Sequence, residues 1–279
     1  MPDPDGPMSP TVSPRWIESV MPFRMSTGPA LPARVSRASV SARISSVMRG
    51  FPGAVLSKGY GAMRAVRNGL AVTLLLAGAV SAEPVTVVAL GDSLTAGYGL
   101  ADQSQGLVPV LEGWLKARAH DVVVQNAGVS GDTTAGGLAR IGWALGPDAD
   151  ALIVTLGGND LLRGIDPAAS KSNLQAILTE AAARKLPVLL VAMRAPGNFG
   201  PEYKAAFDAM YGDLAAEYGT LLAEDFFGGL RAAGADPADP ASLAAFMQAD
   251  GIHPNPEGVK LIVEGLGPKV EELLGEVGS

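Results

Sequence analysis

The stretch VTVVAL at residues 85–90 runs directly into GDSLTAGYG at residues 91–99, and together they set the architecture expected of this chain. The first six residues are apolar nearly throughout, as in a parallel strand that helices cover on both faces. The glycine-rich segment that follows has the composition of a loop. A buried strand followed by such a loop and then by a helix pattern predicts an α/β fold.

The same alternation continues to the C-terminus. Apolar runs predict strands at residues 85–90, 121–126, 151–156, 187–193 and 220–223. Helix patterns lie at residues 107–119, 133–143, 166–184, 201–218 and 256–274, the last with candidate break points at Gly265, Gly267 and Pro268. Asp166 and Pro167 form a helix start signal, an N-cap followed by proline. Such alternation predicts a doubly wound sheet in a single domain at residues 83–279, with ligands bound beyond the carboxyl ends of the strands.

The first 82 residues differ in composition from the rest. Residues 1–62 are rich in Ser, Pro, Arg and Gly without an apolar period, and we expect them to be disordered. Residues 63–82, MRAVRNGLAVTLLLAGAVSA, have the basic start, apolar run and small-residue cleavage site of a secretory signal peptide, with a buried core helix as the alternative. Our hypothesis is that Met63 is the true start of the protein; a genuine basic N-terminal arm is the alternative.

Charge and composition exclude several classes of protein. Residues 83–279 hold 12 basic and 25 acidic residues, a net charge of −13 against −7 for the whole chain, which argues against a nucleic-acid partner. The absence of cysteine excludes a disulfide scaffold, a thiolate metal site, a cysteine nucleophile and a cysteine-linked lipid anchor. Only His120 and His253 can supply an imidazole, and His120 follows a helix pattern, where a solvated, dipole-stabilising role is expected.

Polar residues and glycines follow three of the predicted strands. Ser93 leaves the first strand at a helix start, where its Oγ faces the crevice and N–H groups favour negative charge, although a helix cap fits it equally well. Gly131 lets a backbone N–H approach a ligand, and Asp132 beside it is expected to cap the next helix. Asn159 is either an oxyanion donor or part of a turn.

Asp250 and His253 lie three residues apart in a loop bounded by Gly and Pro. The carboxylate can hold the Nδ1–H of the imidazole, so that Nε2 acts as a base toward a serine hydroxyl. For this pair alone, a surface histidine beside a capping aspartate is the alternative.

Five segments in order resemble the GDSL/SGNH hydrolase family, closely its thioesterase I, lysophospholipase L1 and arylesterase branch. They are VVALGDSLTAGYGL (87–100), VVVQNAGVSGDTTAGGLARI (122–141), VTLGGNDLLRGI (154–165), VAMRAPGNFGPEY (191–203) and MQADGIHPNPEG (247–258). The resemblance covers about residues 85–275. Thr95 is a small departure, since serine often follows GDSL there, but that position is not a catalytic one.

The resemblance implies a flavodoxin-like α/β/α sandwich, the SGNH hydrolase fold, with a five-stranded parallel sheet in the order 2-1-3-4-5. It implies Ser93 as the nucleophile, His253 as its general base and Asp250 as the residue that orients His253. The implied oxyanion hole consists of the backbone N–H groups of Ser93 and Gly131 and the side-chain amide of Asn159. No metal and no organic cofactor is implied.

The resemblance also extends to Arg163 and to the loop at residues 193–203. We expect this loop to line an acyl-binding groove, with Arg163 nearby and with Phe199 and Leu161 as apolar walls. A solvent loop with one anchored aromatic is the alternative. Trp114 and Trp143 lie on helix patterns, where core packing is expected.

These observations lead to the hypothesis of an exported serine ester hydrolase, periplasmic or secreted, without a stable membrane anchor. It would cleave short-to-medium acyl esters or thioesters through an acyl-Ser93 intermediate, as an arylesterase, acyl thioesterase or lysophospholipase. A carbohydrate O-deacetylase is the alternative on the same fold. A non-catalytic binding module is the alternative from another class.

Overall fold

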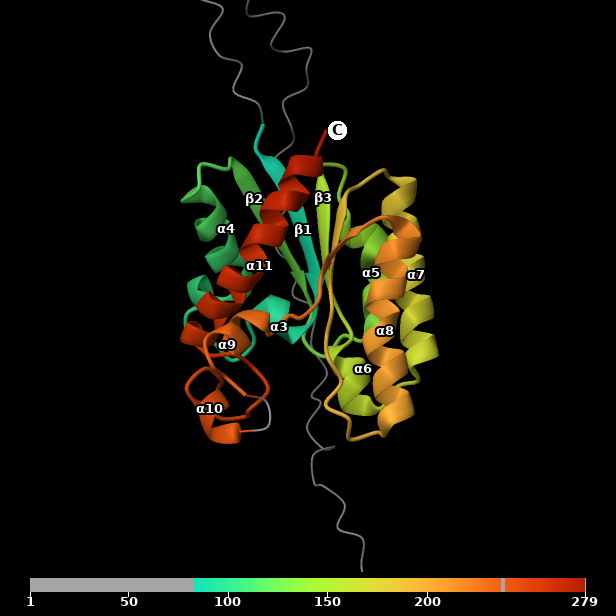
Figure 1. The fold of residues 1–279 in the computed structure, drawn as a ribbon. Helices are drawn as coiled ribbons and strands as arrows, with labels where there is room; N and C mark the ends of the chain where they lie inside the picture. The colour runs from blue at the N-terminus through green and yellow to red at the C-terminus, as the bar shows by residue number, and fades with distance from the viewer. Residues whose placement is uncertain (1–82, 237–238, 279) are drawn as a thin grey trace, which may run out of the picture. The chain divides into compact units, whose positions relative to one another are not determined.

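The computed structural model describes residues 83–236 and 239–278 (Figure 1). The predicted disordered region and signal peptide, residues 1–82, lie outside the described residues. The strands are β1 (Val85–Gly91), β2 (Val122–Gly128), β3 (Ala151–Thr155), β4 (Val188–Val191) and β5 (Leu221–Ala223). The predicted helices are α4 (Leu107–Lys116), α5 (Thr134–Ala144), α7 (Pro167–Ala183), α8 (Pro201–Tyr218) and α11 (Pro256–Glu276). Shorter elements are α3 (Ser93–Ala96), the 3-10 turn η1 (Gln103–Gln105), α6 (Gly158–Arg163), α9 (Gly228–Ala232) and α10 (Pro240–Ala244).

The five strands form one parallel sheet in the order β2-β1-β3-β4-β5, which confirms the predicted order. The central strand β1 pairs with both β2 and β3, and its last residue, Gly91, lies opposite Gly128 and Thr155. Three strands therefore end side by side, and the loops that follow them share one edge of the sheet.

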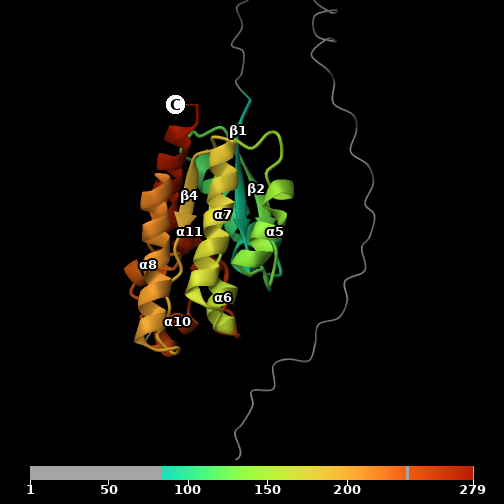
Figure 2. The ribbon, with the colours of Figure 1, turned by 90° about the vertical axis from the view of Figure 1, so that its right-hand side faces the viewer.

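Two layers of helices cover the sheet (Figures 1 and 2). Helices α4, α9 and α11 pack together on one face, whereas α5, α7 and α8 pack together on the other. Every residue of β3 and β4 is buried between these layers, as long apolar runs predict for parallel strands. None of the described helices combines the length and the apolar character that a membrane span requires.

Strand β2 departs from the expectation of strands buried on both faces. Val122 and Val124 are buried, whereas Val123 and Gln125, which alternate with them, are exposed. Helix α4 packs on β2 and α5 packs on β1, so this edge strand is covered on one face. The prediction from its apolar run was wrong here because sequence does not reveal how far a helix layer extends over a sheet.

The two tryptophans differ in burial. Trp114 packs at the margin of the hydrophobic core, as predicted. Trp143 is 84% exposed, so the prediction of core packing was wrong for this residue. The buried positions of α5 include Gly137, Ile141 and Ala144, and this stripe leaves Trp143 on the outer side of the helix.

Helix α11 runs without interruption through its three candidate break points. Pro268 lies inside the helix at an exposed position, so its ring faces solvent rather than the core. Gly267 faces Trp114 of α4, and a Cβ atom on Gly267 would lie 2.6 Å from the indole Cη2. The glycine therefore lets the two helices approach closely and does not mark a helix end.

Candidate active site

Three residues from distant parts of the sequence form a hydrogen-bonded chain at the carboxyl edge of the sheet. Ser93 begins α3 directly after β1, while Asp250 and His253 lie in the loop before α11. The Ser93 Oγ and the His253 Nε2 lie 2.9 Å apart, and the His253 Nδ1 and the Asp250 Oδ2 lie 2.7 Å apart. The structure thus joins the predicted nucleophile, base and orienting carboxylate.

Hydrogen bonds keep Asp250 ionised. Its Oδ1 accepts the backbone N–H groups of Ile252 at 2.9 Å and of His253 at 3.0 Å. Burial by itself would raise the pKa of Asp250, but the bonds from the backbone and ring of His253 and from Ile252 bring it to about 2. An ionised Asp250 accepts the Nδ1–H of His253, which leaves Nε2 free to accept the hydroxyl proton of Ser93.

A second contact holds the His253 loop against the loop after α3. The Nε2 of Gln248 donates to the Tyr98 carbonyl at 2.9 Å and to the Pro254 carbonyl at 3.0 Å, and the Gln248 N–H donates to the His253 carbonyl. The Tyr98 ring lies 4.8 Å from the His253 ring. Sequence reasoning gave neither Gln248 nor Tyr98 a role, although both lie in the motif segments.

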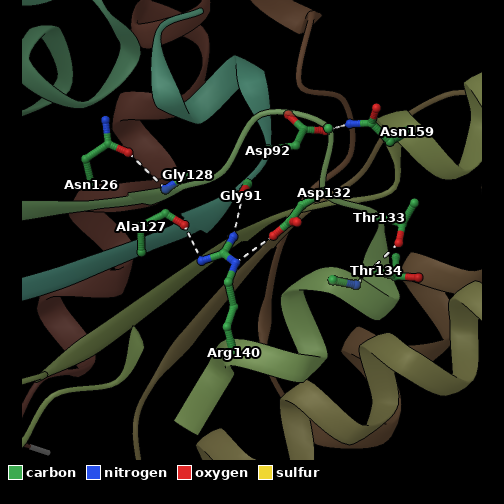
Figure 3. Close-up of polar contacts among 12 residues, drawn as sticks. Gly91, Asp92, Asn126, Ala127, Gly128, Asp132, Thr133, Thr134, Arg140 and Asn159 are labelled. Carbon is green, nitrogen blue, oxygen red and sulfur yellow. Dashed lines mark hydrogen bonds and ion pairs between the residues drawn. The ribbon is translucent and has the colours of Figure 1, made fainter. Parts of the chain in front are cut away.

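Asp92, which precedes the candidate nucleophile, also received no role from the sequence. It is only 1% exposed, and its Oδ1 accepts the Leu94 N–H at 3.0 Å, so Asp92, not Ser93, is the N-cap of α3. Its Oδ2 accepts the Nδ2 amide of Asn159 at 3.2 Å (Figure 3). Burial raises the pKa of Asp92 to about 6, although the bonds from Leu94 and Asn159 and the charge of His253 oppose the rise.

The oxyanion candidates lie in the loops after β2 and β3. Asn159 is in the first turn of α6, and its bond to Asp92 places its amide beside the residue that precedes Ser93. Gly131 has a φ of +85° and is the third residue of a turn closed by a bond from the Asp132 N–H to the Val129 carbonyl. Such a φ is unfavourable for other residues, which explains why glycine occupies this position.

Asp132 does not cap α5, contrary to the prediction. Thr133 is the N-cap and accepts the Gly136 N–H. The Asp132 carboxylate instead pairs with Arg140 of α5, with 2.6 Å between Oδ2 and Nε (Figure 3). Arg140 lies eight residues after Asp132, and local sequence spacing did not indicate it as the partner of this carboxylate.

Behind Asn159, the buried Asp160 connects three elements. It accepts the Thr134 N–H at 2.9 Å, the Thr134 hydroxyl at 2.6 Å and the Ser170 hydroxyl at 2.8 Å. These bonds tie the start of α6 to the start of α5 and to α7. The first turn of α6, which carries Asn159, is therefore anchored by a buried carboxylate whose two oxygens are both hydrogen-bonded.

The three candidate substrate-binding residues lie in different settings. Arg163 is exposed, and its Nη2 donates to the Gly131 carbonyl at 2.8 Å, so the structure brings these two residues together. Leu161 packs partly buried at the margin of the core. Phe199 is half exposed against Gly164, with its ring 5.1 Å from that of Tyr203.

His120 lies at the opposite edge of the sheet from Ser93, because it precedes β2 whereas Ser93 follows the parallel β1. Its Nε2 lies 3.0 Å from Glu271 of α11. This placement leaves His253 as the imidazole of the candidate site. Among the described residues, no group of three or more His, Asp or Glu side chains is arranged to hold a metal ion.

Comparisons with known proteins indicate the family of this chain. Residues 89–261 match the model of the GDSL-like lipase/acylhydrolase family. The esterase TesA of Pseudomonas aeruginosa is 40% identical over 190 residues, 68% of this chain and 89% of TesA. The thioesterase 1/protease 1/lysophospholipase L1 of Escherichia coli is 33% identical over 190 residues, 68% of this chain and 85% of its own.

A solved structure is similar over the same region. The psychrotrophic esterase EstA from Pseudoalteromonas, in a crystal structure inhibited by monoethylphosphonate, is 29% identical with a TM-score of 0.61. The match covers 68% of this chain and 99% of EstA. By its family match, its relatives and its sheet, the chain belongs to the GDSL-like lipase/acylhydrolase family and is an ester hydrolase of the SGNH type.

Proposed function

We propose that the protein is an exported serine hydrolase that cleaves acyl esters or thioesters through an acyl-Ser93 intermediate. The observation that carries this proposal is the chain of contacts from Ser93 through His253 to Asp250, with separations of 2.9 and 2.7 Å. These separations lie within the hydrogen-bond reach that a nucleophile and its base require.

In the first half-reaction, His253 Nε2 takes the hydroxyl proton while Ser93 Oγ attacks the acyl carbon. The tetrahedral oxyanion accepts hydrogen bonds from the N–H groups of Ser93 and Gly131 and from the Asn159 amide. The Asn159 Nδ2 carries two hydrogens, so one can remain on Asp92 while the other reaches the oxyanion. His253 then gives its proton to the leaving alcohol or thiol as the bond to the acyl carbon breaks.

In the second half-reaction, water replaces the serine as the nucleophile. His253 takes a proton from the water, the hydroxide attacks the acyl carbon, and the proton passes to Ser93 Oγ as the carboxylic acid leaves. Asp250 stays ionised throughout and stabilises the imidazolium. No atom outside the chain, the substrate and water is needed.

Export and substrate range are part of the same proposal. The pattern at residues 63–82 supports export and cleavage after Ala82, giving a periplasmic or secreted product. The acyl group that we propose is apolar and of short to medium length. Its apolar character is supported by three exposed side chains near the site: Tyr98 contacts the His253 ring, Ile252 precedes His253, and Leu162 lies three residues after Asn159.

The test is the variant Ser93→Ala, assayed with p-nitrophenyl acetate and butyrate. We expect turnover to fall to background and labelling by a fluorophosphonate probe to disappear, while the unfolding curve stays that of the wild type. Undiminished turnover in this variant would refute the proposal. N-terminal sequencing of the exported protein tests the remainder, with Glu83 as the expected first residue.

A further inference from the structure

The four-residue turn from Val129 to Asp132 determines where the Gly131 N–H points. A bond from the Asp132 N–H to the Val129 carbonyl closes the turn, and Gly131 has the positive φ that the third residue of a type II turn requires. In this turn type the peptide between the second and third residues is flipped relative to a type I turn. The direction of the Gly131 N–H therefore depends on how firmly both ends of the turn are held.

The two ends of this turn meet at one guanidinium. The Val129 N–H donates to the Gly91 carbonyl at 3.0 Å, and the Nη2 of Arg140 donates to the same carbonyl at 2.8 Å. At the other end, the Asp132 carboxylate accepts from the Nε of Arg140 at 2.6 Å. Figure 3 shows Arg140 reaching from α5 toward both groups.

The third contact of Arg140 connects the neighbouring strand. Its Nη1 donates to the Ala127 carbonyl at 2.7 Å, just before the turn begins. One side chain thus binds the end of β1, the end of β2 and the end of the turn, and Gly91 lies two residues before Ser93. The side chains of Arg140 and Asp132 are only 16% and 19% exposed, where charge-assisted bonds are shielded from solvent.

We propose that Arg140, acting with Asp132, is a positioning residue that sets the Gly131 N–H relative to the Ser93 Oγ. This inference rests on the proposed function, because it assigns Gly131 to the oxyanion hole. Arg140 touches no reacting atom. It acts on the transition state by fixing a donor whose position must be correct before charge develops.

Two variants test this inference against a matched control. Arg140→Met removes all three bonds, and Asp132→Asn weakens only the ionic one. The control is Arg184→Met, since Arg184 likewise donates to backbone carbonyls, Leu145 at 2.6 Å and Gly142 at 3.5 Å, and pairs with Glu180. Arg184 connects α7 to the end of α5 and contacts none of the candidate site residues. Ser93→Ala is measured in parallel.

We expect Arg140→Met to lower kcat with p-nitrophenyl butyrate by roughly tenfold to a hundredfold, since loss of a whole oxyanion donor lowers it by about 10²–10³. KM should change less than about twofold, because a donor aimed at the oxyanion contributes little to ground-state binding. Asp132→Asn should lower kcat about threefold to tenfold. Arg184→Met should leave kcat unchanged even where it lowers the unfolding midpoint.

The inference is overturned if Arg140→Met and Asp132→Asn keep kcat within about twofold of Arg184→Met, or if their losses lie in KM alone. If Arg140→Met does not fold, Asp132→Asn decides by the same criteria. Failure of the proposed function gives a different result, since Ser93→Ala would then retain turnover. A dead Ser93→Ala beside fully active Arg140 and Asp132 variants refutes the positioning role alone.

Discussion

Two carboxylates flank the Ser93–His253 pair, and their surroundings shift their pKa values in opposite directions. Asp250 lies in a surface loop with three hydrogen-bond donors, and its pKa is about 2. Asp92 is buried at the end of β1 with two donors, and its pKa is about 6. Both residues are aspartates, so the difference between their pKa values comes from hydrogen-bond donors and burial. An ionised Asp250 can stabilise a protonated His253, whereas the buried Asp92 holds the N–H groups of Leu94 and Asn159 in place.

The largest effect on this contrast is expected from Asp250→Asn. The variant keeps the size of the side chain but removes the charge that, in the proposed mechanism, stabilises the imidazolium and selects the tautomer of His253. We expect kcat to fall by about 10³–10⁴-fold, with the unfolding midpoint near that of the wild type. A kcat within tenfold of the wild type would show that His253 needs no orienting carboxylate.

Asp92 should dominate the pH dependence of stability between its ordinary pKa of 3.8 and its folded value of about 6. In this window the folded state binds a proton that the unfolded state has lost, so the free energy of unfolding falls as pH rises. A shift of this size corresponds to about 3 kcal/mol at most. Urea unfolding at pH 4 and pH 7 measures it.

The control for this pH dependence is Asp92→Asn, which cannot titrate. The difference in unfolding free energy between wild type and variant should change between pH 4 and pH 7, moving in favour of the variant as pH rises. A difference that is constant across this range would contradict the assignment of a raised pKa to Asp92.

Gln248→Ala should have a smaller effect on activity. It removes one bond within the His253 loop, to the Pro254 carbonyl, and one bond from this loop to the Tyr98 carbonyl in the loop after α3. Of these two bonds, only the second joins the two loops. One ordinary hydrogen bond contributes about 1 kcal/mol, so kcat should fall roughly threefold to tenfold. Gln175→Ala is the matched control, since Gln175 makes an exposed side-chain bond to Glu217 between α7 and α8. Equal kcat values in both variants would remove Gln248 from the site.

The smallest expected effect is a loss of stability at low pH that is caused by protonation of Asp250. Its folded pKa lies below its ordinary value, so its contribution to stability is complete above pH 3.8 and is lost as pH falls toward 2. Solvent screens this half-exposed side chain, which keeps the effect modest. Wild type should lose stability over this range more steeply than Asp250→Asn; parallel unfolding curves would speak against it.

Patterns local in sequence predicted much of this molecule. The apolar runs located all five strands, and the Asp166-Pro167 signal located the start of α7, where Asp166 accepts the Ala168 N–H. The motif segments named the three residues whose side chains meet at 2.9 and 2.7 Å. Each of these features is encoded within a few neighbouring residues or in a family motif.

Features that depend on tertiary partners were missed. Asp132 pairs with Arg140 instead of capping α5, because a guanidinium eight residues away outcompetes a local N–H. Asp92 received no role, since its bond to Asn159 spans 67 positions. The exposure of Trp143 followed from which side of α5 faces the sheet. Short elements such as α3 and α6 have too few residues for a helical period to appear.

The separation of Ser93 from His253 has a consequence for biogenesis. The bond between them joins residues 160 positions apart, and the histidine loop leads directly into α11, the last of the described helices. Helix α11 packs against α4, which follows Ser93, so contacts between residues far apart in sequence join the two ends of the described domain. In the proposed mechanism, a chain that lacks residues 250–276 keeps Ser93 but has no His253 to act as its base. We therefore expect esterase activity only once this C-terminal segment has joined the domain, and a chain truncated before Asp250 should be inactive toward esters.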